Sequence, residues 1–110
     1  PAYLQYMDVC CMYYLTNNIW IQSCNPKKTL EYLATGKPFV CVDFPEIHYF
    51  KDCVYIAKNK EEFETCLKTA LHEKSTEKTN ARIKVAQEHT WDHIAQRAGA
   101  LIQAAINKRN

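Results

Sequence analysis

Glycine, proline and long apolar runs are scarce in this sequence. Its 110 residues include two glycines and four prolines, and apolar residues make up 47% of the chain against 24% charged residues. These proportions exclude a collagen-like, low-complexity or intrinsically disordered chain. Apolar stretches such as residues 9–15 are far shorter than the roughly 20 residues of a membrane-spanning helix. The sequence therefore predicts one globular domain without a membrane span, since single cores serve about 50–200 residues.

An excess of charge of one sign is missing as well. Lysine and arginine number 14 against 12 aspartates and glutamates, which leaves a formal net charge of +2, and the mild basic excess lies in residues 51–110. A nucleic-acid-binding surface shows a clustered basic face. We therefore expect neither DNA nor RNA as a partner.

The six cysteines lack the Cys-x-x-Cys spacing of a zinc or thioredoxin-like site. Most of them lie in apolar runs beside valine, phenylalanine or leucine, where a free cysteine packs as a small hydrophobe. Cys10 and Cys11 are adjacent, so in a strand they face opposite sides, which disfavours a disulfide between them. This usage predicts free thiols in a reducing, cytoplasmic compartment.

The histidines do not suggest a metal site. His89 and His93 are four residues apart, a spacing that places two ligands on one helix face, but Thr90 between them is typical of a helix cap. No third ligand is near in sequence, whereas a catalytic zinc ion needs three protein ligands. His48 and His72 have no partner in sequence, and we expect both to face solvent. The sequence predicts no metal ion and no cofactor.

Three apolar segments predict strands. Residues 8–14 and 39–43 are continuous apolar runs rich in strand formers, which is typical of strands buried on both faces, and residues 53–57 form a shorter third strand. A helix remnant over residues 2–7 leads into the first strand. Residues 15–24 read as a long polar loop, in which Asn17, Asn18, Trp20 and Gln22 either contact a ligand or belong to a mobile loop with one packed tryptophan.

One predicted helix connects the first two strands, a loop connects the second and third, and the remaining helices follow the third strand. The helices are predicted over residues 26–36, over 60–71 behind an Asn59 cap, from the polar break at 74–76 through 88, and from 91 onward behind a Thr90 cap. The last helix spaces six residues for burial: Trp91, Ile94, Ala95, Ala98, Leu101 and Ile102.

This order of elements predicts an α/β fold, a partial Rossmann-like parallel sheet of about three strands flanked by helices. Three strands make half of a doubly wound domain. The first strand has the composition of a central strand, so here it would lie at an exposed, apolar edge.

The helix predicted over residues 26–36 carries the clearest pattern of a binding site. Asn25 is placed to cap it, Pro26 stands at its first position, and Gly36 ends it in a left-handed conformation. In open α/β sheets such helix starts attract anions, because their backbone amides are unpaired and the helix dipole favours negative charge. The amides and side chains of Lys27 and Lys28 therefore suit a diphosphate.

Glu31 lies one turn beyond Lys28 on the same helix face. A carboxylate at this depth can accept hydrogen bonds from the two hydroxyls of a ribose. The alternative is an ordinary capped amphipathic helix with a Lys27–Glu31 surface pair. Asp43 and Glu46, at the end of the second strand, can contact a sugar hydroxyl, or can serve turn formation and solvation alone.

Residues 25–40 read Asn-Pro-Lys-Lys-Thr-Leu-Glu-Tyr-Leu-Ala-Thr-Gly-Lys-Pro-Phe-Val. They resemble Pro-x-Lys-x-x-Glu-Tyr-x-Ala-x-Gly-Lys-Pro-Val-Val, a motif in the C-terminal domain of group 1 (family 4-like) nucleotide-sugar glycosyltransferases of the GT-B fold. The family continues with a short Pro-Glu loop, as in Pro45-Glu46 here. Residues 3–14, 55–71 and 88–91 resemble further family segments in the same order, so the resemblance covers most of the chain and is more specific than one short motif.

The resemblance implies that this chain is the C-terminal part of a GT-B nucleotide-sugar-binding domain. The chain begins with Pro1 rather than methionine, and we expect a longer protein with an N-terminal domain. Such an enzyme moves a sugar from a nucleoside-diphosphate-sugar to an acceptor, a glycan or a lipid-linked or polysaccharide precursor. The enzyme would be cytoplasmic, and this location includes the cytoplasmic face of a membrane.

Family roles carry over to matching positions only. The glutamate that matches Glu31 binds the donor ribose, and the helix start that matches Asn25, Pro26, Lys27 and Lys28 faces the donor diphosphate. Many members have Glu-x7-Glu, with the first glutamate near the transferred sugar, but here that position is Ser23. Ser23, Asp43 and Glu46 are therefore candidate sugar or acceptor contacts, and no catalytic residue is assigned.

The alternative function is a non-catalytic Rossmann-like module that binds a partner protein through its first strand or the Trp91 helix. In either case we expect the isolated chain to bind nucleotide weakly or not at all. We also expect it to self-associate through the edge of the first strand.

Overall fold

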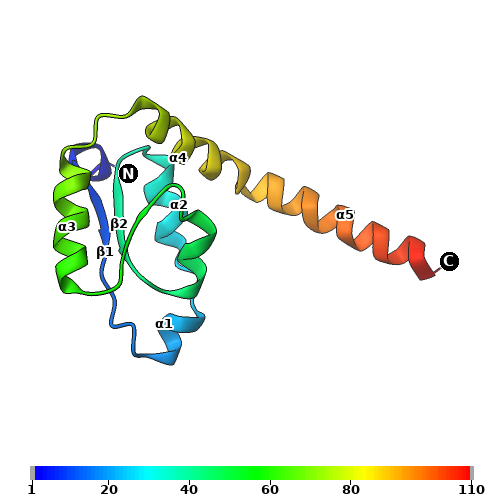
Figure 1. Cartoon of the computed structure of the whole chain (residues 1–110). Helices are drawn as coiled ribbons and strands as arrows, with labels where there is room; N and C mark the ends of the chain where they lie inside the picture. Colours follow the sequence, from blue (N-terminus) through cyan, green and yellow to red (C-terminus); the bar gives the residue numbers. More distant parts are fainter. Residues whose placement is uncertain (1, 110) are drawn as a thin grey trace.

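Three parallel strands form one sheet in the computed structural model, which describes residues 2–109. The order is β1 (Cys10–Met12), β2 (Phe39–Val42) and β3 (Tyr55–Ala57), with Val40 of the central strand opposite Cys11 and Tyr55. Helices flank the sheet (Figure 1). The prediction of an α/β fold with a three-stranded parallel sheet is confirmed, and so is the position of β1 at its edge.

The helices form a layer on each face of the sheet. Helix α3 (Lys60–Leu71) packs against β2 and β3, and α2 (Lys27–Ala34) packs against α4 (Thr76–Glu88) on the other side (Figure 1). Shorter elements complete the chain: the 3-10 helices η1 (Leu4–Tyr6) and η2 (Pro45–Phe50), and the single-turn helix α1 (Ile19–Ser23). Helix α1 lies within the segment predicted as a loop, and Asn18 caps it by accepting a hydrogen bond from the Trp20 amide at 2.8 Å.

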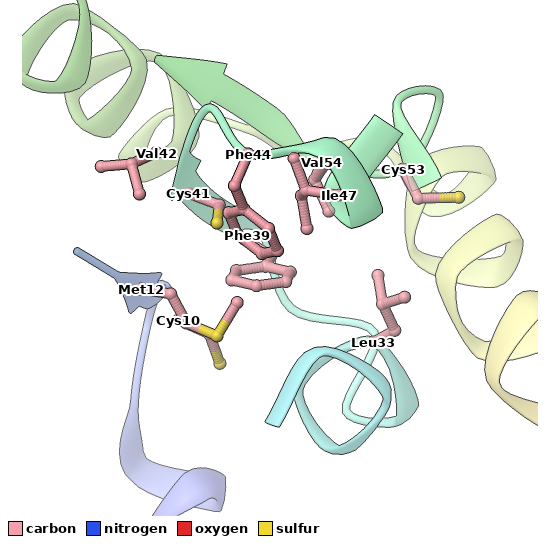
Figure 2. Packing of buried hydrophobic residues seen from close by; sticks show 10 residues of the cluster. All are labelled: Cys10, Met12, Leu33, Phe39, Cys41, Val42, Phe44, Ile47, Cys53 and Val54. Carbon is pink, nitrogen blue, oxygen red and sulfur yellow. The ribbon is translucent and has the colours of Figure 1, made fainter. Parts of the chain in front are cut away.

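The central strand carries the core. All four β2 residues are buried, as the sequence predicts, and Figure 2 shows the Phe39 and Phe44 rings at the centre of the apolar cluster. The Phe39 ring meets Tyr32 of α2 edge-on, with ring centroids 5.3 Å apart. The prediction that the first strand is buried on both faces is wrong: Cys11 is exposed, since α3 packs over β2 and β3.

Side-chain caps fix where the later helices begin. The Asn59 carboxamide oxygen accepts from the Glu62 amide at 2.8 Å, and the Thr90 hydroxyl accepts from the His93 amide at 3.4 Å. Both caps are as predicted. Gly36 follows α2 in a left-handed conformation, with a φ of +74°, as the sequence predicts. A Cβ there would lie 2.7 Å from a methyl carbon of Thr79, so glycine also permits α2 and α4 to approach closely.

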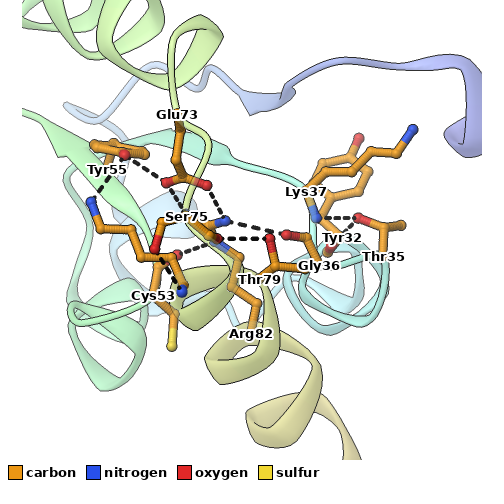
Figure 3. Close-up of polar contacts among 11 residues, drawn as sticks. Tyr32, Thr35, Gly36, Lys37, Cys53, Tyr55, Glu73, Ser75, Thr79 and Arg82 are labelled. Atoms are coloured by element: carbon orange, nitrogen blue, oxygen red, sulfur yellow. Dashed lines mark hydrogen bonds and ion pairs between the residues drawn. The ribbon is translucent and has the colours of Figure 1, made fainter.

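Arg82 is the most notable buried residue of the fold, at 1% exposure. Its guanidinium donates to both carboxylate oxygens of Glu73, at 2.6 and 2.7 Å, and to the backbone carbonyls of Cys53 and Gly36, at 2.8 and 3.2 Å (Figure 3). Glu73 also accepts from the Tyr55 hydroxyl at 2.6 Å. One side chain of α4 therefore joins the end of α2, the start of β3 and the end of α3.

The prediction that the last helix is buried is wrong. Helix α5 (Trp91–Arg109) projects away from the sheet beyond α4 (Figure 1), and Trp91, Leu101 and Ile102 are 84%, 71% and 62% exposed. Its length explains this, because 19 residues of α-helix span about 28 Å whereas strands of three or four residues span about 10–13 Å. The sheet is too short to cover both α4 and α5. Within residues 2–109 we find no helix that is both long and apolar enough to cross a membrane.

Substitution of Arg82 by methionine tests the role of its ion pair. The change leaves the Glu73 carboxylate, 5% exposed, buried without its cation, so we expect a loss of about 3–5 kcal/mol in the free energy of unfolding. Urea denaturation measures it. Lys84→Met on the exposed side of α4 is the control, with an effect below about 0.5 kcal/mol. An Arg82→Met protein as stable as this control would contradict the assignment.

The same ion pair predicts a loss of stability in acid. Hydrogen bonds from Arg82 and Tyr55 lower the pKa of the Glu73 carboxyl, although burial opposes them. A lowered pKa stabilises the fold above the unfolded-state value of about 4.3, and the gain disappears as the pH falls through the folded-state pKa. The stability lost between pH 7 and pH 3 should therefore be smaller in Glu73→Gln than in the unmodified chain, and unchanged by Glu64→Gln, on the exposed side of α3. Equal losses in Glu73→Gln and the unmodified chain would refute the linkage.

Candidate functional site

Helix α2 begins one residue later than its sequence predicts. Pro26 occupies the N-cap position with φ −64° and ψ 129°, and the helix starts at Lys27. Because Pro26 keeps an extended ψ, helical geometry begins after it, and Asn25 lies outside the capping position. The predictions of Asn25 as the cap and of Pro26 as the first helical residue are therefore wrong. Among residues 2–109 no side chain caps this helix, and the amides of Lys27 and Lys28 have no acceptor within it.

The start of α2 lies toward the end of the sheet where the strands finish. The chain leaves β1 at its carboxyl end, passes through α1 and enters α2, and α1 packs against η2, which follows β2. This is where ligands bind in open parallel sheets. The unpaired amides of Lys27 and Lys28 therefore lie on the side of the sheet where the sequence predicts an anion.

One side of α2 is open to solvent and is called here the α2 face. It consists of Lys27, Lys28, Glu31 and Ala34, while Thr29 and Leu33 point into the fold. The Lys27 ammonium lies 3.6 Å from a Glu31 carboxylate oxygen, so Lys27 forms the predicted surface ion pair with Glu31. The Lys27 side chain is 88% exposed and that of Glu31 is 48% exposed, and ion pairs at the surface contribute little to stability. Their charges therefore remain accessible to a ligand.

A hollow of about 510 Å³ adjoins the far end of the α2 face. Its lining is mainly apolar and comprises Leu4, Gln5, Glu31, Ala34, Thr35 and Lys37. The Lys37 ammonium donates to the backbone carbonyls of Leu4 and Gln5, both at 2.6 Å, and also to that of Met7. These bonds hold η1 against the end of α2 and so form one wall of the hollow.

A second hollow, of about 280 Å³, gathers residues from beyond all three strands. Asp43 follows β2 directly, Lys58 follows β3 directly, and Thr16 and Gln22 belong to the segment after β1. Phe44, Pro45 and His48 complete the lining. The carboxyl ends of parallel strands meet at one edge, which explains why residues so far apart in sequence converge.

His48 and Asp43 form a pair in this hollow. His48 is exposed, as the sequence predicts, and its Nε2 lies 2.5 Å from Asp43 Oδ1. The sequence carries little sign of this pair, because it depends on how η2 folds back after β2. Sequence reasoning therefore missed His48 as a candidate site residue.

A third hollow, of about 340 Å³, shares His48 and Pro45 with the second and adds Glu46 and Tyr49. We name the second and third hollows together the His48 groove. The predicted sugar contacts Asp43 and Glu46 both line this groove. Ser23 is exposed at the end of α1 and lies outside its lining residues, and Asn25 is exposed in the link to α2.

The cysteines, His89 and His93 are not among the residues that line these hollows. All six cysteines are free, and burial raises the pKa of the Cys41 thiol to about 12. His89 pairs with the Val85 carbonyl and His93 with the Thr90 hydroxyl, each at 2.8 Å from Nδ1. Over residues 2–109, no group of three or more His, Cys, Asp or Glu side chains is placed to hold a metal ion.

Comparisons of this chain with protein-family models, with curated proteins and with solved structures give no match. The likeness to nucleotide-sugar glycosyltransferases therefore rests on residues 25–40 and on the segments that accompany them.

Proposed function

We propose that this chain is the donor-binding part of a nucleotide-sugar glycosyltransferase. The observation that carries the proposal is the arrangement of the α2 face, an uncapped helix start with two lysines and a carboxylate one turn beyond it. The motif in residues 25–40 supports the same assignment. A GT-B enzyme would need a second domain, so this chain would supply one side of the cleft.

The donor nucleotide would lie along the α2 face. Its diphosphate would accept hydrogen bonds from the amides of Lys27 and Lys28, where the helix dipole also favours negative charge. Glu31 would accept hydrogen bonds from the ribose hydroxyls. The base would enter the hollow beside Leu4 and Gln5, whose mainly apolar walls suit an aromatic ring.

The chemical contribution of α2 would be electrostatic. In sugar transfer, a bond forms between an acceptor oxygen and the anomeric carbon, while the bond from that carbon to the diphosphate breaks and its electron pair leaves with the nucleoside diphosphate. Preorganised donors stabilise the charge that develops on this leaving group. The α2 amides and the Lys28 ammonium would be such donors, and a general base would take up the proton of the acceptor hydroxyl.

The exposed apolar side of α5 favours a second candidate function. Trp91, Leu101 and Ile102 are large, exposed and on one helix. An exposed apolar patch of this kind marks a protein interaction surface. A non-catalytic interaction module would use α5 and leave the α2 face without a ligand, so nucleotide binding separates the two functions.

Variants of the α2 face test the donor site. The sequence leaves weak binding or no binding as the expectation for the isolated chain, and the uncapped start of α2 favours weak binding. At least one of uridine, guanosine and adenosine diphosphates should therefore give saturation-transfer NMR signals with this chain. Lys28→Ala and Glu31→Ala should each weaken binding about threefold or more, as expected for loss of one hydrogen bond or charge contact. Lys28→Ala should affect the diphosphate more than the free nucleoside, because only the diphosphate carries the negative charge that Lys28 attracts.

Matched controls lie on α3, where Lys68 and Glu64 are exposed lysine and glutamate residues. Lys68→Ala and Glu64→Ala should leave nucleotide affinity unchanged. If the α2 variants bind every nucleotide as tightly as these controls, or if none of the three nucleotides binds, the proposed donor site is wrong.

A further inference from the structure

Helix α5 is open to solvent along its whole length. Each residue from Trp91 to Arg109 is exposed, and Figure 1 shows the helix extending away from the sheet and from the helices that flank it. Its large apolar side chains have exposed fractions between 38% and 84%: Trp91, Ile94, Leu101, Ile102 and Ile106. A helix with so much apolar surface in water gains free energy when a partner covers it.

The apolar residues follow the repeat of a coiled coil. Spacings of four and three residues alternate along Trp91, Ala95, Ala98, Ile102 and Ala105, which we call the α5 seam. At 3.6 residues per turn, these five residues lie along one side of the helix. Further apolar residues border the seam, Ile94 and Leu101 on one side, Gly99 and Ile106 on the other. A seam with this repeat packs against a second helix of the same kind.

The charges at the two ends of α5 determine the orientation of such a helix pair. The first turn contains Asp92, whereas the last turn contains Lys108 and Arg109. In a parallel pair of α5 helices, like charges would meet at both ends. In an antiparallel pair, Asp92 of each copy lies beside the basic turn of the other, and the opposed helix dipoles add to the attraction. The charges of α5 are therefore complementary to a second, antiparallel copy of α5.

The sizes of the seam residues agree with the antiparallel arrangement. When the first turn of one copy lies beside the last turn of the other, the midpoint falls near Gly99. Ala98 then faces Ile102 of the second copy, so that a small residue meets a large one, and Ala95 faces Ala105, which permits the helix axes to approach closely. Trp91 faces Arg109, whose guanidinium can lie over the indole ring. Each layer of the seam is thus filled by the same seam in a second copy.

A membrane surface fits α5 less well than a second helix. Helices that lie on membranes have lysine and arginine on the polar side and large apolar residues on the other. Three of the five seam residues are alanine, and the side opposite the seam is formed by His93, Gln96, Ala100 and Asn107. Small residues bury little area in lipid, whereas they bring two helices together.

The edge of β1 is also a weaker site for self-association than α5. The sequence predicts that copies of the chain associate through this edge, but β1 has only three residues. A strand this short offers few backbone groups to a second chain, and short edge strands are one way in which proteins avoid edge-to-edge association.

We infer that α5 pairs with α5 of a second copy of this chain, in an antiparallel two-helix contact along the α5 seam. A seam about 28 Å long buries on the order of 1,000 Å² over both copies, which is near the lower limit of specific interfaces. The dimer is therefore weak and reversible. This inference goes beyond the donor site, because the α2 face and its hollow are formed by residues between Leu4 and Lys37.

Sedimentation and fluorescence of the full chain test the inference. We expect a monomer–dimer equilibrium between about 5 μM and 1 mM, the range of weak complexes. In Trp20→Phe, Trp91 is the single tryptophan, and its emission should shift to shorter wavelength as the dimer forms. A chain that stays monomeric at 1 mM would overturn the inference, whether or not it binds vesicles of phosphatidylcholine and phosphatidylglycerol. A dimer with unchanged Trp91 emission would overturn it too, because the contact would then lie elsewhere.

Two alanines of α5 provide a matched pair of variants. Ala98 lies in the seam and Ala100 on the opposite side, so Ala98→Glu and Ala100→Glu make the same change of charge and of helix propensity. Ala98→Glu places a carboxylate against Ile102 of the second copy and should weaken dimerisation about tenfold or more. Ala100→Glu should dimerise like the unmodified chain. Equal dimer affinities for the two variants would refute the seam.

Charge exchange tests the antiparallel orientation. Asp92→Lys places like charges together at both ends of the dimer and should weaken dimerisation about threefold or more. Adding Lys108→Glu and Arg109→Glu should restore the affinity, because each new lysine then lies beside a glutamate of the second copy. The helix dipole disfavours all three substitutions, so a restored affinity arises from contact between the copies. A triple variant that dimerises no better than Asp92→Lys would contradict the antiparallel pair.

Discussion

The buried guanidinium of Arg82 is the contact on which this fold depends most. It meets the Glu73 carboxylate and two backbone carbonyls, and so joins α4 to the ends of α2 and α3 and to the start of β3. A sheet of three short strands leaves a small core. A buried charge of this kind is costly unless every donor has a partner. The contact also requires the close approach that Gly36 permits between α2 and α4.

Features set by neighbouring residues could be predicted from the sequence. The Asn59 and Thr90 caps, the left-handed Gly36 and the buried strand β2 each depend on a few adjacent side chains. The parallel sheet could be predicted because apolar segments separated by helices have few alternative folds. In the candidate site, Glu31, Asp43 and Glu46 were identified from their place after a helix start or a strand, and the structure brings the last two into one groove.

Features set by residues that lie far apart in the chain could not be predicted from the sequence. Arg82 meets the Gly36 carbonyl 46 residues away, and an arginine within an amphipathic helix carries no mark of burial. The apolar spacing of α5 indicates a buried helix but says nothing of whether the sheet extends far enough to cover it. At α2, a single extended ψ at Pro26 moves the helix start past Asn25. The Asp43–His48 pair depends on the fold of η2, which local periodicity does not encode.

The proposed function assigns charge stabilisation to the start of α2, on the carboxyl side of the sheet. The most direct test of this account is a map of amide shifts as the full chain is titrated with uridine, guanosine or adenosine diphosphate. The account predicts that one of these shifts the Lys27, Lys28 and Glu31 amides saturably, and more than its nucleoside does. Shifts absent from α2, or confined to α5, would contradict it.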